Sequence, residues 1–190
     1  MASNPLMTQS TKEEAQAIVR RPFALTRQLG GSGRRSPRRV ATSLTAGQRA
    51  VTVFDVSLYK GKTGSDGGMV FSHYSAAAVR LDRRIEGRAA LLRTGLLRAP
   101  VKPGLPEHGE LGGHRVYASA PELADALAPL DAWLATQGCH FELVHDWVLA
   151  YGRRRLLTPR GGLVRAADAL AERLPGAVFG APAAPLHNAA

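Results

Sequence analysis

A glycine pair followed by two side chains that can contact phosphate lies near the middle of the chain, at Gly112, Gly113, His114 and Arg115. Glycine has no Cβ, so its main-chain amides can approach a ligand closely. Histidine supplies a titratable nitrogen, and arginine supplies a fixed fork of five N–H donors. The four residues together predict a corner of the fold that could hold a phosphate group. The alternative is an ordinary turn that leads into a strand.

A second set of phosphate-capable residues is made of arginines. Arginine binds phosphate in a bidentate geometry that lysine lacks. The candidate nucleic-acid contacts are Arg34, Arg35, Arg38, Arg39, Arg83, Arg84, Arg153, Arg154 and Arg155. Asp82 and Glu86 stand among the middle arginines, so a solvated helix face is the alternative interpretation of that group.

The charge of the chain favours a polyanionic partner. The 190 residues carry a formal net charge of +10, and most of the excess lies before residue 51. A basic segment of this kind can concentrate nucleic acid or an anionic membrane surface. A solubilising tail, or the arginine and alanine bias of a GC-rich genome, would give the same composition.

Other features argue against several classes of protein. The single cysteine, Cys139, excludes an internal disulfide framework and suits a reducing compartment. No apolar run is long enough to span a membrane, and the N-terminus has no apolar signal core, so a cytoplasmic protein is expected. The histidine spacing and the lack of CxxC or HExxH motifs predict no metal site. The Gly-Lys-Thr at 61–63 is not a P-loop, because Val56 stands where the motif needs glycine.

Composition divides the chain into three parts. Residues 1–48 are rich in Ser, Thr, Arg, Gly and Pro and predict a disordered basic arm. Residues 49–175 predict a globular domain, and residues 176–190 a flexible Ala/Pro-rich tail. Within the domain we expect strands over residues 51–59, 69–74, 96–101 and 141–151. We expect helices over residues 75–93, 119–134 with a break at Pro129, and 158–174. Strands that alternate with helices predict a single α/β or α+β domain with a mixed sheet.

The stretch ALLRTGLLRAPVKPG, followed by GELGGHRVYASAPELADAL, resembles the ParB/sulfiredoxin superfamily over roughly residues 89–127. The resemblance implies a ParB/sulfiredoxin-like domain in which Gly112, Gly113, His114 and Arg115 bind nucleotide phosphate. The catalytic cysteine of sulfiredoxins has no counterpart here, and the chain after residue 160 is too short for the DNA-binding and dimer domains of ParB. The chain is therefore nearest to Osa-like plasmid fertility-inhibition factors, which implies action on transferred DNA, with ATP and Mg²⁺ as candidate cofactors.

Two hypotheses follow for function. In the first, the protein is a DNA-processing, fertility-inhibition-type factor of plasmid conjugation with nuclease or NTPase activity. Arg115 would hold phosphate, His114 would transfer a proton, and Glu107 or Glu110 would hold a divalent metal. In the second, it is a non-enzymatic plasmid or viral accessory protein that binds nucleic acid through its basic arm. A factor that binds only another protein is a third alternative.

Overall fold

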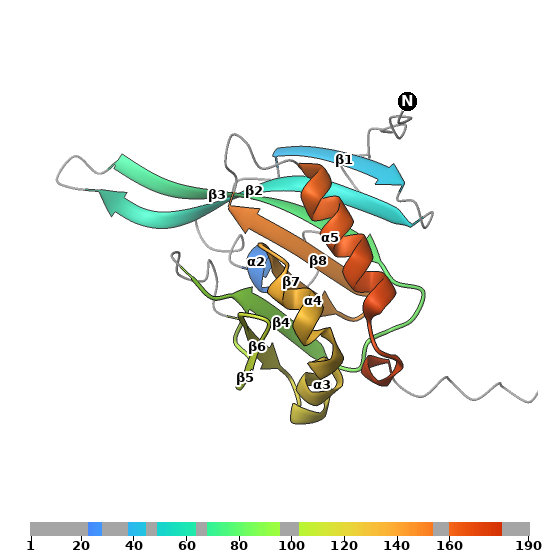
Figure 1. Cartoon of the computed structure of the whole chain (residues 1–190). Helices are drawn as coiled ribbons and strands as arrows, with labels where there is room; N and C mark the ends of the chain where they lie inside the picture. Colours follow the sequence, from blue (N-terminus) through green and yellow to red (C-terminus); the bar gives the residue numbers. More distant parts are fainter. Residues whose placement is uncertain are drawn as a thin grey trace, which may run out of the picture.

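Eight strands form one sheet that organises the molecule (Figure 1). The computed structural model describes residues 23–27, 38–44, 49–63, 68–95, 103–153 and 160–179. The strand order is β1-β2-β3-β8-β7-β4-β6-β5, and every pairing of these strands is antiparallel. The α+β class is therefore confirmed, whereas the expected mixed sheet is antiparallel in the described part of the chain.

The elements have the following bounds. The strands are β1 (Arg38–Leu44), β2 (Ala50–Thr63), β3 (Gly68–Arg80), β4 (Arg88–Arg93), β5 (Glu107–Leu111), β6 (His114–Ala118), β7 (His140–Val144) and β8 (Trp147–Arg153). The helices are α2 (Ala24–Arg27), α3 (Pro121–Ala126), α4 (Asp131–Ala135) and α5 (Arg160–Arg173), with 3₁₀ turns η2 (Ala128–Leu130) and η3 (Gly176–Val178).

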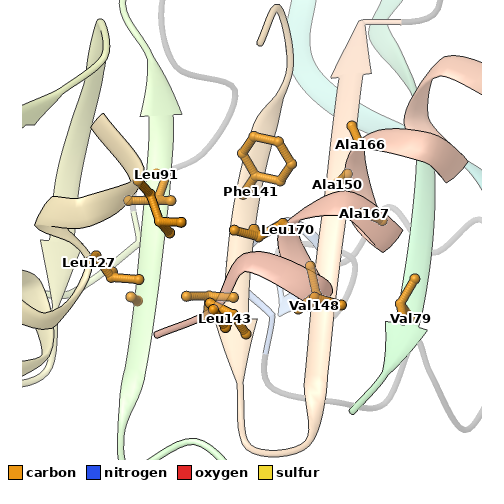
Figure 2. Packing of buried hydrophobic residues seen from close by; sticks show 14 of the residues in the cluster. Val79, Leu91, Leu127, Phe141, Leu143, Val148, Ala150, Ala166, Ala167 and Leu170 are labelled. Atoms are coloured by element: carbon orange, nitrogen blue, oxygen red, sulfur yellow. The ribbon is translucent and has the colours of Figure 1, made fainter. Parts of the chain in front are cut away.

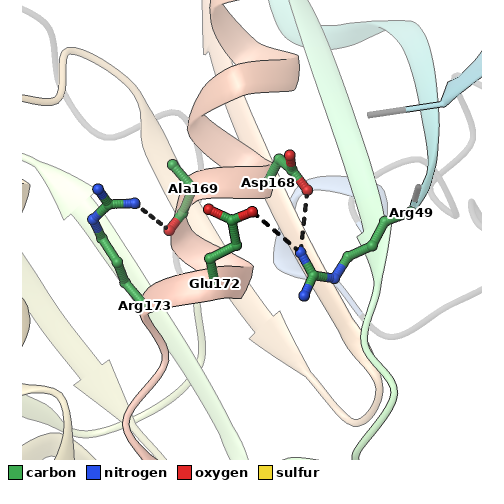
Figure 3. Close-up of polar contacts among 5 residues, drawn as sticks. All are labelled: Arg49, Asp168, Ala169, Glu172 and Arg173. Atoms are coloured by element: carbon green, nitrogen blue, oxygen red, sulfur yellow. Dashed lines mark hydrogen bonds and ion pairs between the residues drawn. The ribbon is translucent and has the colours of Figure 1, made fainter. Parts of the chain in front are cut away.

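The main hydrophobic core lies between one face of the sheet and helices α3, α4 and α5. Leu91, Phe141 and Leu143 of the sheet and Leu127 and Leu170 of the helical layer are each fully buried there (Figure 2). Apolar burial of this extent is the dominant favourable term in folding. The same face carries the ion pairs of Arg49, just before β2, to Asp168 at 3.4 Å and Glu172 at 3.7 Å on α5 (Figure 3).

The alanine-rich stretch after residue 75 is part of β3, so the helix expected over residues 75–93 is wrong. Ala76, Ala77 and Ala78 are fully buried, and Ala77 faces the main core while its two neighbours face the other side. Strands β2 and β8 pair with this segment on its two edges. Tertiary pairing therefore overrides the helix propensity of alanine, which is only a weak preference.

Residues 141–151 form two strands and a turn instead of the single strand that alternation predicted. Strands β7 and β8 pair antiparallel from His140 opposite Tyr151 to Val144 opposite Trp147. His145 and Asp146 make the two-residue turn, and His145 has φ 56. No glycine marks this turn, which is why the apolar pattern reads as continuous.

The other two predicted helices are confirmed. Pro129 separates α3 from α4, as expected, and α5 covers most of the last predicted helix. Ala120 is the N-cap of α3, and it makes no side-chain cap hydrogen bond. The Ser119 hydroxyl accepts the N–H of Arg88 at 3.0 Å.

Two segments of the predicted arm are elements of this fold. The segment 23–27, which includes α2, packs on the second face of the sheet, and β1 pairs with β2. The other residues of the predicted arm before residue 49, the predicted tail from residue 180 and the strand expected over residues 96–101 lie outside the described residues. None of the described helices is long and apolar enough to cross a membrane.

Candidate functional site

The glycine pair forms the turn of the β5–β6 hairpin. Leu111 pairs with His114, and Gly112 and Gly113 between them have φ 52 and 70. Positive φ at both central residues is the pattern of a type I′ turn. The Gly112 N–H donates to Asp131 Oδ1 at 2.7 Å, and its carbonyl accepts Arg93 Nη1 at 2.8 Å. These main-chain groups therefore fasten the hairpin to α4 and β4.

His114 is completely buried beneath this turn. Its Nδ1 lies 3.1 Å from the Gly112 carbonyl, and its Nε2 lies 2.9 Å from the Cys139 carbonyl. Burial lowers the pKa of His114, while the two carbonyls act in the opposite direction. The ring thus joins the hairpin to the residue that precedes β7, and its side chain has no contact with solvent.

Arg115 lies on the other side of β6 from His114, because successive side chains of a strand point to opposite faces. Its guanidinium is exposed, with Nε 4.0 Å from Glu107 Oε1. The structure therefore does not bring the two side chains into one site. A joint catalytic role, and cofactor binding by Gly112 and Gly113, stay predictions from sequence.

The arginines of the second predicted set are also dispersed. Arg83 and Arg84 lie in the β3–β4 connection. Arg153 is the last residue of β8, at the end of the strand that is distant from the β7–β8 turn. Arg38 and Arg39 belong to β1. The remaining members, Arg34, Arg35, Arg154 and Arg155, lie outside the described residues.

The second face of the sheet carries a buried acid, which no sequence motif marked. Glu142 of β7 is only 2% exposed. Its Oε1 accepts the Leu25 N–H at 3.0 Å, and its Oε2 accepts the Ala24 N–H. Phe23 and Leu25 are both fully buried in the apolar cluster around it. The carboxylate thus holds two adjacent donors that lie between two apolar side chains.

The apolar cluster of this face spans five strands. Its sheet members are Phe54, Val56, Leu58, Tyr74, Ala76, Ala78, Ala90, Leu92, Val144, Leu149 and Tyr151. Among the described residues, its only members from outside the sheet are Phe23, Ala24 and Leu25. This surface, with Glu142 and residues 23–25, is called the Glu142 face below.

Three titratable side chains lie close together on the Glu142 face. Burial raises the pKa of Glu142 to about 7, against the opposing effect of the Ala24 and Leu25 amides. Burial and the neighbouring Glu142 carboxyl raise the pKa of Tyr151. The His140 ring lies 5.2 Å from the Tyr151 ring, and burial lowers the pKa of His140 to about 4. Near neutral pH the uncharged forms of His140 and Tyr151 are therefore favoured, and Glu142 is poised between its two forms.

The described residues contain no group of three His, Cys, Asp or Glu side chains that could hold a metal ion. The polar groups of the Glu142 face are instead suited to hydrogen bonding. A carboxylate accepts through two oxygens, and a tyrosine hydroxyl both donates and accepts.

A solved structure matches this chain over most of its length. It is the crystal structure of the mycobacterial trehalose monomycolate transport factor A, TtfA, with a TM-score of 0.61 and 13% sequence identity. The match covers 93% of this chain and 88% of that chain. At this identity the match shows a shared fold. No protein-family model matches the sequence, and no curated protein matches it closely enough to indicate a family.

This finding corrects two expectations from the sequence. The resemblance to the ParB/sulfiredoxin superfamily and to Osa-like factors is wrong, because the matched fold is that of a transport factor. Residues 89–127 begin in β4, where the sequence predicted the end of a helix, and they include an antiparallel hairpin and α3. The nucleic-acid-directed function is wrong for the same reason: the structural neighbour is a transport factor.

Proposed function

We propose that this protein is an accessory factor in transport that binds an amphiphilic molecule with a hydroxylated head on its Glu142 face. The observation that carries the proposal is the way in which Glu142 binds the chain's own segment. One carboxylate accepts two adjacent donors, and large apolar side chains lie beside them. A molecule with neighbouring hydroxyl groups and an acyl chain offers the same combination of groups.

The hydroxylated head would be recognised by the carboxylate. Neighbouring hydroxyls of a sugar present two O–H donors to the two oxygens of Glu142, as the Ala24 and Leu25 amides do. Hydrogen bonds to a charged acceptor contribute about 1.5–3 kcal/mol each, more than neutral ones. The Tyr151 hydroxyl, buried beside the same carboxyl, can donate to or accept from a further hydroxyl.

The acyl chain would occupy the apolar part of the face. Phe23 and Leu25 are each buried without exposure against the cluster of strands β2, β3, β8, β7 and β4. Burial of each methylene group contributes about 0.8 kcal/mol of binding free energy. An acyl chain of many methylene groups therefore gains enough free energy to displace the short segment 23–25. Binding on this proposal is an exchange, in which residues 23–25 leave the face and the ligand takes their place.

The solved transport factor supports the choice of ligand class. It is named for the transport of trehalose monomycolate, an acylated sugar. The matched fold extends over almost all of both chains, so the strands of the Glu142 face lie within the shared architecture. The proposal transfers the ligand class, not the individual molecule.

Binding of dodecyl maltoside, below the concentration at which it forms micelles, tests the proposal. Maltose and dodecanoate would be titrated separately, because they carry the head and the chain alone. The readouts are the NMR shifts of the Ala24 and Leu25 amides and the fluorescence of Trp147, which packs against the cluster. We expect saturable binding of dodecyl maltoside, with both parts alone much weaker.

A matched pair of variants locates the binding. Glu142→Gln removes the carboxylate while keeping the size of the side chain. It weakens the hold on residues 24 and 25 for every ligand, so we expect the preference for dodecyl maltoside over dodecanoate, which lacks the hydroxylated head, to fall by roughly tenfold or more. Glu122→Gln removes an exposed acid from α3 and should leave both the affinity and this preference unchanged. The proposal fails if dodecyl maltoside does not bind the wild-type chain, or if both variants keep the wild-type preference for it over dodecanoate.

A further inference from the structure

A pocket lined by arginines lies where the β3–β4 connection crosses the tip of the β7–β8 hairpin. Its volume is about 480 Å³, within the range of sites for small molecules. The lining residues are Arg80, Leu81, Asp82, Arg83, Arg84, His145 and Asp146. None of them belongs to the Glu142 face, so this pocket is independent of the function proposed above.

Main-chain hydrogen bonds hold the two walls of the pocket together. The Leu81 N–H donates to the Asp146 carbonyl at 2.7 Å, and the Ile85 N–H donates to the His145 carbonyl, also at 2.7 Å. Leu81 and Ile85 are themselves buried in the main core. The connection is thus fixed at both ends, and the arginines between these anchors project from a positioned loop.

The charged side chains of the pocket are arranged around the turn. Arg80 Nε lies 3.0 Å from Asp146 Oδ2, and the guanidinium of Arg83 lies over the Phe179 ring, 4.7 Å from its centroid. Arg84 Nη2 lies 3.2 Å from His145 Nδ1. Arginine is always a donor, so Nδ1 is the acceptor here and the ring carries its proton on Nε2. A guanidinium group has five N–H donors. Arg80 uses one of its donors in the contact with Asp146, and Arg84 uses one in the contact with His145.

His145 occupies a backbone conformation that its side chain makes costly. Its φ is 56, and among the described residues it is the only non-glycine with positive φ. Positive φ at the first of two turn residues is the pattern of a type II′ turn, a position usually held by glycine. Strained residues of this kind persist where the surrounding structure holds them, and they cluster at functional sites. Here the imidazole is placed against the arginines of the pocket.

We propose that this pocket binds the tetrahedral oxyanion of a small phosphorylated or sulfated molecule. Three guanidinium groups and an imidazole N–H line the site, against two carboxylates, of which Asp146 is already paired with Arg80. One guanidinium group can bind two oxygens of a phosphate through two parallel N–H···O hydrogen bonds. Donors from two separate elements suit an anion with three or four oxygens better than a planar carboxylate with two.

The test is a titration of the full-length, isotope-labelled protein followed by NMR. Inorganic phosphate and sulfate are the probes, and acetate is the planar comparison. Glycerol 3-phosphate and vesicles of phosphatidylcholine with and without phosphatidylglycerol distinguish a free phosphate ester from a lipid headgroup. We expect phosphate and sulfate to shift the Arg84 and His145 resonances in a saturable way, with affinity in the millimolar range or better and acetate clearly weaker.

Three variants decide whether the pocket itself is responsible. Arg84→Gln should weaken phosphate binding by roughly tenfold. Arg165→Gln removes an exposed arginine on α5 outside the pocket and should change it by less than about twofold, as a screened distant charge does. His145→Gly should raise the melting temperature, because the positive φ is relieved, and yet weaken phosphate binding. Absence of saturable shifts, equal losses in the two arginine variants, or full affinity in His145→Gly would each overturn the proposal.

Discussion

Substitution of Gly112 by alanine tests whether the glycine pair serves the packing of the hairpin. A Cβ at Gly112 would lie 2.7 Å from the carbonyl carbon of Leu134, and closer still to the main-chain nitrogen of Ala135 and the carbonyl oxygen of Asp131. These atoms belong to the backbone of α4 and its end and cannot move aside as a side chain can. Either the hairpin or α4 must therefore shift.

The expected cost of Gly112→Ala has two parts. Positive φ costs a residue with a Cβ about 1–2 kcal/mol. Overpacking against the backbone adds about 1–3 kcal/mol. The total of about 2–5 kcal/mol is a large share of the stability of an ordinary domain, which is about 5–15 kcal/mol.

Two other glycines separate these parts. Gly104 has φ +68 with no atom within 4 Å of an added Cβ, so Gly104→Ala carries the φ cost alone. At Gly113, φ is +70 and the nearest atom, at 2.9 Å, is Nη1 at the end of the Arg93 side chain. That end can move, although its hydrogen bond to the Gly112 carbonyl would weaken. The costs should therefore rise in the order Gly104, Gly113, Gly112.

Urea unfolding, followed by far-ultraviolet circular dichroism, measures all three variants against the wild type. The packing of the hairpin on α4 is the reason for the difference between Gly112→Ala and Gly104→Ala. Equal costs for these two variants would refute that reasoning. The glycine pair would then be free for the ligand contact that the sequence predicted.

Buried and ion-paired side chains give four more tests. Burial raises the pKa of Glu142 to about 7, so the folded state holds this proton more tightly than the unfolded chain, and the contribution of Glu142 to stability should fall by about 3 kcal/mol as pH rises from 4.5 to 7. The opposing contribution of His140 overlaps this range, so urea unfolding should show the slope in the difference between the wild type and Glu142→Gln, and a difference that does not change with pH would contradict it. Burial lowers the pKa of His140 to about 4, so its contribution should be lost as pH falls from 6.5 to 4; His140→Gln should remove this opposite slope, and an unchanged pH profile would count against it. Phe23→Ala removes a fully buried ring and should speed hydrogen exchange of the Ala24 amide by roughly tenfold or more, whereas an unchanged rate would mean that the ring does not hold the segment. Arg49→Gln breaks partly exposed ion pairs and should cost less than about 1 kcal/mol in low salt, with a smaller loss at high salt; a cost that salt does not change would argue for another contact.

Local signals in the sequence predict the helical layer better than the sheet. Pro129 ends one helix and permits the next, and the apolar spacing of Leu163, Ala167 and Leu170 marks the buried side of α5. These features act within one turn or two of helix, so a single sequence reveals them. The prediction of an α/β or α+β domain rested on strands that alternate with helices, and the structure is α+β.

The wrong predictions concern features that depend on distant partners. Alanine favours helix when nothing else acts, but Ala76 and Ala78 lie between two strands and under residues 23–25. The turn at His145 lacks the glycine or asparagine that normally marks a hairpin, because its conformation is held by hydrogen bonds from the β3–β4 connection. Neither the strand pairing at Ala76 and Ala78 nor the hydrogen bonds to the His145 turn can be inferred from the residue types at these positions.

Glu142 shows how a candidate site can escape a motif search. An acid within a strand of buried residues must have hydrogen-bond partners, because an unpaired buried charge is very costly. The strand alone therefore predicts that Glu142 has hydrogen-bond partners. Those partners are the main-chain amides of Ala24 and Leu25, which lie 118 and 117 positions earlier in the chain. Every residue except proline has a main-chain amide, so no sequence motif can mark these donors. The signal available in the sequence is the acid itself, flanked by Phe141 and Leu143, and the fold supplies the rest by placing residues 23–25 over it.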